Sequence, residues 1–320
     1  MWGLLGVVAL SACAAPKIED PRTARAEAMS RVQSWDEATS LWNEIYIASG
    51  ATDVEAGLES ARAMLQADLF DGARARLVAL SSLAPQRGEI FRLLGEAHEG
   101  LGDTGAARSN YGIAVTLDSK DATAFRQLGA LECSAGAHDT GLDSLRTSLK
   151  LDPENPETRL VFGLCAAEAG ALDEAAPILN KALKGPRATD GERLRAARAL
   201  GPDKRVIPWL EPVVRRHPQN TEAQRRLGEG YALAGRLDSA LDALTAAAQS
   251  DPGDALALAS LARAYIMRGE PGQARAVIDH ARALDLTAFE KSLFKEVEDA
   301  LAASLGSEGG PTDAVPPGDS

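Results

Sequence analysis

The sequence predicts an all-helical chain built from one repeated unit, and three observations support this. A 34-residue period places glycines at two fixed positions in three successive units: Gly95, Gly129 and Gly163, and Gly102, Gly136 and Gly170. A fixed period of this size is typical of repeat architectures. Aromatic residues make up only 4% of the chain and alanine is abundant, as close packing between helices requires.

Each position of the unit has a mechanical reason, counting from Gly88. Positions eight and twenty are small, so the two helices of a hairpin can approach closely, and larger residues beside them fill the remaining space. Glycine at position fifteen can take the left-handed conformation that ends the first helix. Proline at position thirty-two cannot continue the second helix and stops it. Aspartate at position eighteen can cap the second helix, and it occurs as Asp139, Asp173 and Asp238.

The unit resembles the tetratricopeptide repeat, whose signature combines Trp-x₂-Leu-Gly-x₂-Tyr, Ala-x₃-Phe and a later proline. The unit that starts at Gly88 has Leu94, Gly95, Ala107 and Tyr111 in the matching positions. The resemblance implies an all-α, right-handed superhelical solenoid of about eight helical hairpins with a C-terminal capping helix. Contacts in such a solenoid are expected between neighbouring units only.

The register of the repeat divides the chain into segments. We expect a signal segment at 1–13, a linker at 14–21, repeats over 22–288, a capping helix at 289–305 and a disordered tail at 306–320. The tail prediction follows from its content of glycine, proline and acidic residues. The predicted repeat units are 22–50 (degenerate), 54–87, 88–121, 122–155, 156–189, 190–220 (irregular), 221–254 and 255–288.

The irregular unit is the most individual part of the array. Pro153 and Pro218 are 65 residues apart instead of the 68 that two periods require. Pro208 can open a helix in its first turn. The stretch around Trp209 therefore has two interpretations, a docking notch for a partner or a worn repeat, and the worn repeat is favoured.

Residues 1–13 indicate an export signal that ends in a lipid-attachment site. An apolar run over 2–10 precedes the sequence Leu-Ser-Ala-Cys, which ends at Cys13. This order resembles the bacterial lipobox, in which the cysteine is lipid-modified, for example with palmitate. The apolar run is too short to span a bilayer as a permanent helix. Ala14, where an aspartate would favour retention in the inner membrane, suggests an outer-membrane protein that faces the periplasm.

The composition and the motifs argue against several kinds of site. The net charge of −12 argues against nucleic-acid binding, which needs a clustered basic face. None of the histidines pairs with another residue at metal-ligand spacing; they are His98, His138, His217 and His280. We therefore expect no catalytic residues, no metal, no cofactor and no small-molecule substrate.

Two cysteines lie in adjacent units, Cys133 at position twelve and Cys165 at position ten of their first helices. A disulfide is possible in an oxidising bacterial envelope. Position ten should face the packed interior and position twelve the groove, so the two side chains should diverge, which disfavours a bond. Two unpaired, small apolar residues are therefore favoured over a disulfide.

The concave face is the binding surface that the resemblance implies. Candidate partner-binding residues on its first helices are Arg62, Arg92, Glu96, Glu99, Arg126, Leu160, Leu164, Arg225, Glu229, Arg263 and Ile266. The arginines among them could act as hydrogen-bonding forks for an extended peptide or a partner helix. For Ile266 and Met267 an equally weighted alternative is that they pack on the terminal helix.

Together these features favour a non-catalytic scaffold that is lipid-anchored to the bacterial envelope and binds protein partners. The architecture is similar to that of the pilotins and of the repeat lipoproteins of tight-adherence pilus systems, which suggests assistance to an outer-membrane complex such as a secretin. That likeness is one of architecture alone. The alternative is a recruiter or regulator of cell-wall or exopolysaccharide enzymes, and an enzyme is a remote third.

Overall fold

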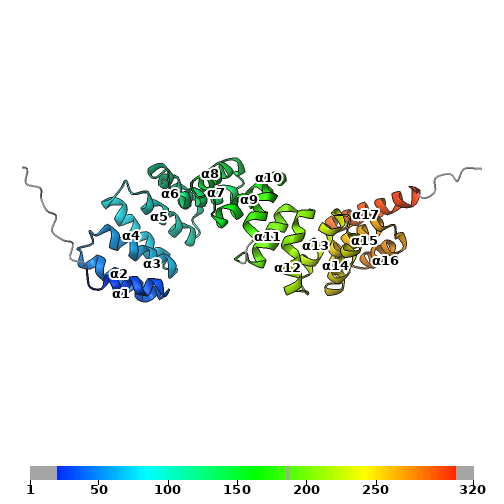
Figure 1. Ribbon diagram of the computed structural model, residues 1–320, viewed down its shortest axis with the longest axis horizontal. Helices are drawn as coiled ribbons and strands as arrows, with labels where there is room; N and C mark the ends of the chain where they lie inside the picture. The colour runs from blue at the N-terminus through cyan, green and yellow to red at the C-terminus, as the bar shows by residue number, and fades with distance from the viewer. Residues whose placement is uncertain (1–19, 185–186, 308–320) are drawn as a thin grey trace, which may run out of the picture. The chain divides into compact units, whose positions relative to one another are not determined.

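The computed structural model describes residues 20–184 and 187–307, and over these ranges the chain forms helices joined by short connections, with no strand (Figure 1). The predicted all-α fold class is confirmed. The predicted signal segment, the Cys13 lipid site, most of the linker and most of the tail lie outside the described residues. Within those residues, no helix has the length and apolarity that a membrane span requires.

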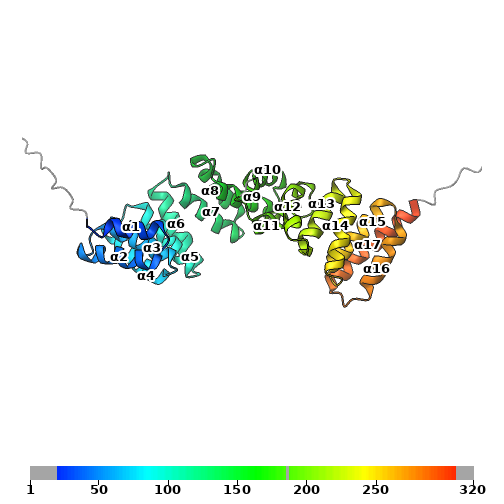
Figure 2. The same cartoon turned by 60° about the horizontal axis from the view of Figure 1, so that its bottom comes forward.

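The helices pair in order along the chain as hairpins. The pairs are α1 (Thr23–Arg31) with α2 (Trp35–Ala48), α3 (Val54–Gln66) with α4 (Phe70–Leu83), α5 (Gly88–Gly100) with α6 (Thr104–Leu117), α7 (Ala122–Ser134) with α8 (His138–Leu151), α9 (Pro156–Glu168) with α10 (Leu172–Leu183), α11 (Asp190–Leu200) with α12 (Ile207–Arg216), α13 (Thr221–Leu233) with α14 (Leu237–Ser250), and α15 (Ala255–Arg268) with α16 (Pro271–Arg282). A short 3₁₀ turn, η1 (Lys204–Val206), precedes α12. The last helix, α17 (Ala288–Ser307), packs against α15 and α16 (Figure 2).

The helices group into two compact units, the first ending at Leu128 and the second starting at Gly129, inside α7. The core of the first unit is formed by α1 to α5 and includes the fully buried Leu77 and Ile90. The second unit has a core that runs from α7 to α14, around Phe162. Another cluster in the second unit joins α15, α16 and α17. The repeat period alone did not predict this grouping.

Small residues at position eight allow the two helices of a hairpin to approach closely, as predicted. A Cβ atom added to Gly129 on α7 would lie 2.7 Å from the carbonyl oxygen of Gly141 on α8. In the first unit, a Cβ on Gly95 would overlap the ring of Tyr111, which is fully buried. A side chain at either glycine would therefore push the hairpin apart.

The predicted helix ends are confirmed at the glycine and proline positions. Gly102, Gly136 and Gly170 all have the left-handed conformation, with φ of +76° to +79°. These values suit glycine, which has no Cβ to clash. Prolines at position thirty-two follow the last residue of a second helix by two positions; they are Pro85, Pro153, Pro218 and Pro252.

The predicted caps at position eighteen are wrong. The cap residue of α8 is Ala137, and Asp139 lies inside the first turn, because the helix begins earlier than the prediction placed it. Asp173 and Asp238, at the same position, instead accept hydrogen bonds from arginines of the following unit. Side-chain caps precede several first helices, where Asp53, Asn155, Asn220 and Asp254 accept backbone N–H groups, and one second helix, α6, which Asp103 caps.

The irregular unit contains no docking notch at Trp209. The indole is only 2% exposed, and its Nε1 donates a hydrogen bond to Asn180 Oδ1 at 3.2 Å. Pro208 lies in the first turn of α12, as predicted. Trp209 is therefore a core residue of the second unit, in line with the interpretation of this stretch as a worn repeat.

Candidate functional site

In the first unit, three of the predicted groove residues converge on one hollow. Arg62 on α3 and both Arg92 and Glu96 on α5 line a cavity of about 350 Å³. Trp35 and Leu65 add apolar surface to the same wall. The structure therefore brings these predicted residues to one place.

The two arginines of this hollow are engaged inside the first unit. Arg62 donates to glutamates on its own helix and, at Glu89, on α5. Arg92 donates from Nη1 to Glu96 Oε1 at 2.5 Å and from Nε to Asp121 Oδ2 at 3.1 Å. Burial opposes the ionisation of Glu89. The guanidinium groups of Arg62 and Arg87 outweigh this effect and hold the pKa of Glu89 below its usual range. A partner would have to displace these bonds before it could use the arginines as forks.

The remaining first-unit candidates lie apart from the hollow. Glu99 accepts a hydrogen bond from the hydroxyl group of Tyr111 on α6. Burial of the ring and this bond both raise the pKa of Tyr111, so the phenol stays neutral at ordinary pH. Arg126 lies half-buried on α7.

In the second unit, Leu160 and Leu164 on α9 belong to the core more than to the surface. Leu164 is only 2% exposed, and Leu160 packs against the same core cluster. These two leucines therefore offer little area to a partner.

Two other candidates of the second unit, Glu229 and Arg263, line a second hollow, which we call the Glu229 pocket. Its volume is about 160 Å³, and its wall consists of Pro202, Glu229, Ala232, Leu233, Leu244, Ser260, Arg263, Ala264 and Met267. Leu233 and Met267 are about half exposed there. The pocket is thus mainly apolar, with a carboxylate and a guanidinium group in its wall.

The carboxylate of Glu229 is only partly satisfied. Its Oε1 accepts hydrogen bonds from Arg225 Nη1 at 2.8 Å and from Ser260 Oγ at 2.7 Å. Its Oε2 is buried and has no hydrogen-bond partner within the described residues. Arg263 is 45% exposed on the side chain and contacts Glu296 of α17 at 3.2 Å. Two predicted residues, Glu229 and Arg263, therefore line one pocket, and a third, Arg225, binds the carboxylate of Glu229.

The alternative raised for Ile266 and Met267 holds for the first residue and not for the second. Ile266 packs against the hydrophobic cluster to which α17 contributes Phe294 and Val297. Met267 remains exposed at the Glu229 pocket. Neighbouring residues on a helix differ by about 100° in direction, so Ile266 and Met267 can have different surroundings. The sequence could not separate them, because the position of α17 decides which of the two is covered.

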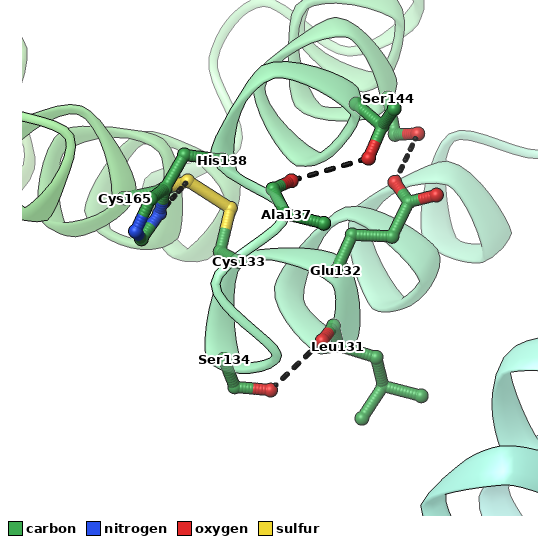
Figure 3. Close-up of a disulfide and its surroundings, with 9 residues drawn as sticks. Leu131, Glu132, Cys133, Ser134, Ala137, His138, Ser144 and Cys165 are labelled. Carbon is green, nitrogen blue, oxygen red and sulfur yellow. Dashed lines mark hydrogen bonds between the residues drawn. A yellow bond between two sulfur atoms is a disulfide. The ribbon is translucent and has the colours of Figure 1, made fainter.

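The preference for unpaired cysteines is wrong, because Cys133 and Cys165 form a disulfide, with a Cα–Cα distance of 5.7 Å (Figure 3). Both are buried. The sulfur of Cys133 lies against α8, where a Cβ on Gly141 would come within 2.5 Å of it, and Cys133 also lines a hollow with residues of α9 and α11. Because Gly141 has no side chain, there is room for the sulfur of Cys133 beside α8, from where it bonds to Cys165 of the next repeat.

The histidines have no metal-ligand spacing along the chain, but the fold places one of them beside the disulfide. His138, the first residue of α8, places its Nδ1 3.9 Å from Cys165 Sγ (Figure 3). One ligand atom each of Cys133, His138 and Cys165 lies within 4.8 Å of the others. The three residues come from three helices, so no spacing along the chain could have revealed the group.

Comparisons with known proteins agree with the repeat assignment. Two tetratricopeptide-repeat family models match, one at residues 134–193 and one at residues 231–288. A search of curated proteins found no match.

Many solved structures are similar to this chain. The C-terminal part of a tetratricopeptide-repeat protein from Cytophaga hutchinsonii has a TM-score of 0.50 at 16% identity, over 87% of this chain and 98% of that one. MamA has a TM-score of 0.44 at 22% identity, over 51% of this chain and 88% of that one. YrrB, described as a tetratricopeptide-repeat protein with an unusual peptide-binding site, has a TM-score of 0.42 at 18% identity, over 70% of this chain and 97% of that one. The period, the helical hairpins and the two family matches together identify this chain as a tetratricopeptide-repeat protein.

Proposed function

We propose that this chain is a protein-interaction scaffold whose second unit binds a segment of a partner protein at the Glu229 pocket. The observation that carries the proposal is the buried Oε2 of Glu229, which lacks a hydrogen-bond donor beside an apolar wall. A buried acceptor without a donor costs about 1–3 kcal/mol. A partner that supplies an N–H group, from its backbone or from an amine, would recover that free energy once a side chain of the pocket wall, such as the exposed Met267, rotates to uncover the oxygen.

The rest of the pocket indicates the other half of the recognised segment. Leu233 and Met267 are exposed, and methionine adapts its shape to the side chain that it meets. A partner segment that places an apolar side chain next to its N–H donor would cover both. The first-unit hollow is a weaker candidate, because Arg62 and Arg92 are already bound to acids of their own unit.

Photo-crosslinking in intact cells tests this proposal. A photo-crosslinking amino acid in place of Met267 should give a discrete crosslinked product, because this position borders the pocket. The matched control is the same amino acid in place of Val78, which lies in the first unit. Met267 and Val78 are 53% and 54% exposed. Equal products from both positions, or none from Met267, would contradict the proposal.

The substitution Glu229→Gln tests the role of the carboxylate. A hydrogen bond to a charged group contributes about 1.5–3 kcal/mol, so the Kd for the crosslinked segment should rise about 10- to 100-fold. The measurement is a binding titration of the purified chain with a synthetic copy of that segment. Glu298→Gln, on the exposed face of α17 where it pairs with Arg282, is the matched control and should leave the Kd unchanged.

The proposed place of action is the bacterial envelope, with the chain attached by a lipid at Cys13 and the scaffold facing the periplasm from the outer membrane. The Leu-Ser-Ala-Cys sequence supports this address. There the scaffold would help to assemble an outer-membrane complex such as a secretin or a pilus. The identity of the crosslinked partner decides between this role and the recruitment of cell-wall or exopolysaccharide enzymes.

Replacing Cys13 with alanine tests the address. We expect the Cys13→Ala chain to lose incorporation of labelled palmitate and to move from the membrane fraction to the soluble fraction, because the lipid at Cys13 is the proposed attachment to the membrane. Double replacement of Cys133 and Cys165 with alanine is the control and should keep both the label and the membrane fraction. A Cys13→Ala chain that stayed in the membrane fraction would rule out the lipid anchor.

A further inference from the structure

We propose that Cys133, His138 and Cys165 form a zinc site that becomes available when their disulfide is reduced. Two thiolates and one imidazole are ligands that zinc prefers, and three protein ligands leave a fourth position for water or another group. The proposal is independent of the Glu229 pocket. It rests on the convergence of three side chains from α7, α8 and α9 (Figure 3).

The geometry brings the ligands close before any metal arrives. The Nδ1 atom of His138 lies 3.9 Å from the sulfur of Cys165, and the three ligand atoms all lie within 4.8 Å of one another. In a tetrahedral zinc site, two sulfurs at 2.3 Å from the metal are about 3.8 Å apart. The two sulfurs would therefore separate by less than 2 Å or so from their bonded positions, a change on the scale of a side-chain rotation.

The backbone around the group is held by contacts other than the disulfide. Leu145 on α8 and Phe162 on α9 are buried in the core cluster that surrounds the cysteines. Gly141 leaves room for the Cys133 sulfur where any other residue would fill it. We expect the three ligands to stay near one another after reduction.

The group is also within reach of solvent. Cys133, His138 and Cys165 line a hollow of about 500 Å³, together with Ala130, Ser134, Gly136, Val161, Leu164, Glu168 and Arg195. His138 is partly exposed, whereas both sulfurs are buried. Zinc can therefore enter from the hollow, and water or the exposed carboxylate of Glu168 can supply the fourth ligand.

The chemistry has two balanced steps. A dithiol reductant gives two electrons and two protons to the disulfide; the S–S bond breaks, two thiols form, and the dithiol is itself oxidised to a disulfide. Zinc then replaces the two thiol protons, which pass to solvent, while neutral His138 offers the lone pair of Nδ1. The oxidised chain lacks both thiolates and should not hold the metal, so the site is coupled to the redox state of its surroundings.

Zinc titration of the full chain tests the proposal, in a Cys13→Ser background so that the third cysteine adds no thiol. The reduced chain, under exclusion of oxygen, competes with a chromophoric chelator for Zn²⁺. We expect one zinc ion per reduced chain, and at least about 100-fold weaker binding by the oxidised chain. Co²⁺ in place of zinc should give the thiolate charge-transfer and tetrahedral d–d absorption bands.

The decisive variant is His138→Ala, which keeps both cysteines and the disulfide. It should weaken zinc binding by the reduced chain at least tenfold and alter the cobalt bands. The matched control is His280→Ala, on α16 in another repeat of the second unit. It should bind zinc as tightly as the parent chain does. Three outcomes would overturn the proposal: equal zinc binding by the reduced and oxidised chains, unchanged binding by His138→Ala, or a reduced chain whose helical circular-dichroism signal is lost and is not restored by zinc.

Discussion

Replacing Trp209 with alanine is expected to lower the free energy of unfolding of the second unit by about 3–5 kcal/mol. The indole is almost fully buried in the core cluster that joins α9 to α13. Its loss removes that buried area and leaves a cavity, because the surrounding helices can collapse only partly. The substitution also leaves Asn180 without the donor that now satisfies its side-chain oxygen.

The irregular unit makes this substitution especially damaging. Between α11 and α12 the hairpin connection is the short turn η1, and α12 has only 10 residues. In a repeat array, each unit is stabilised mainly by contacts with its neighbours. Trp209 therefore lies in the least regular repeat of the second unit, where fewer regular helix contacts can compensate for its loss.

Urea denaturation followed by circular dichroism measures the loss, and hydrogen–deuterium exchange with mass spectrometry locates it. We expect faster exchange in peptides from α10 to α13, and unchanged exchange in α3 to α5. The control is Trp35→Ala, since Trp35 is only partly buried, in the first unit; its effect should be smaller and confined to that unit. A change below about 1 kcal/mol for Trp209→Ala would show that the indole does not support the core.

The sequence predicted those parts of the fold in which one residue type is needed for one local backbone conformation. Glycine at Gly102, Gly136 and Gly170 marks a left-handed backbone because other residues are strained there. Proline marks a helix end because it lacks the N–H group that a helix needs. Aspartate is less informative: it is favourable both as a cap and within the first helical turn. For this reason, Asp139 was predicted as the cap of α8, although it lies two residues after the cap residue Ala137.

The parts that the sequence did not predict depend on what faces a residue from another helix. Cys133 lines a hollow, as its position predicts, but Gly141, which has no side chain, leaves room for the sulfur to bond to Cys165. Pattern analysis could have found this, because a glycine at position twenty occurs where a cysteine stands at position twelve.

The prediction that the groove arginines are available to a partner has a different weakness. They are on the predicted face, but acids at the start of the next hairpin within the same compact unit bind them, as Glu89 binds Arg62 and Asp121 binds Arg92. Such pairs lie 27 and 29 residues apart in the sequence, several residues short of one repeat length. A search for opposite charges at this spacing would therefore have indicated that these arginines are engaged. The unpaired oxygen of Glu229 could not be found in this way, because it reflects the detailed packing of α13 against α15.

Removing the disulfide is expected to lower the free energy of unfolding of the second unit by about 3–4 kcal/mol. The two cysteines are 32 residues apart, and the chain-entropy model gives a loss of this size for a loop of that length, because the bond restricts the unfolded chain. The loop spans α8 and the connections on either side of it, so the bond joins two neighbouring repeats within the second unit. The test is urea denaturation of the Cys133→Ser, Cys165→Ser double variant beside the parent chain.

Reduction separates the effect of the bond from the effect of the serines. The parent chain treated with a phosphine reductant, without metal, should lose the same free energy as the double variant, and the reductant should leave the double variant unchanged. If zinc binds as proposed, adding Zn²⁺ to the reduced parent should restore part of the loss, since a ligand that binds only the folded chain stabilises it. The His138→Ala chain, equally destabilised by reduction, should recover less with zinc. A reduced parent as stable as the oxidised chain would mean that helix packing alone holds α7 to α9, and that the bond does not stabilise the unit.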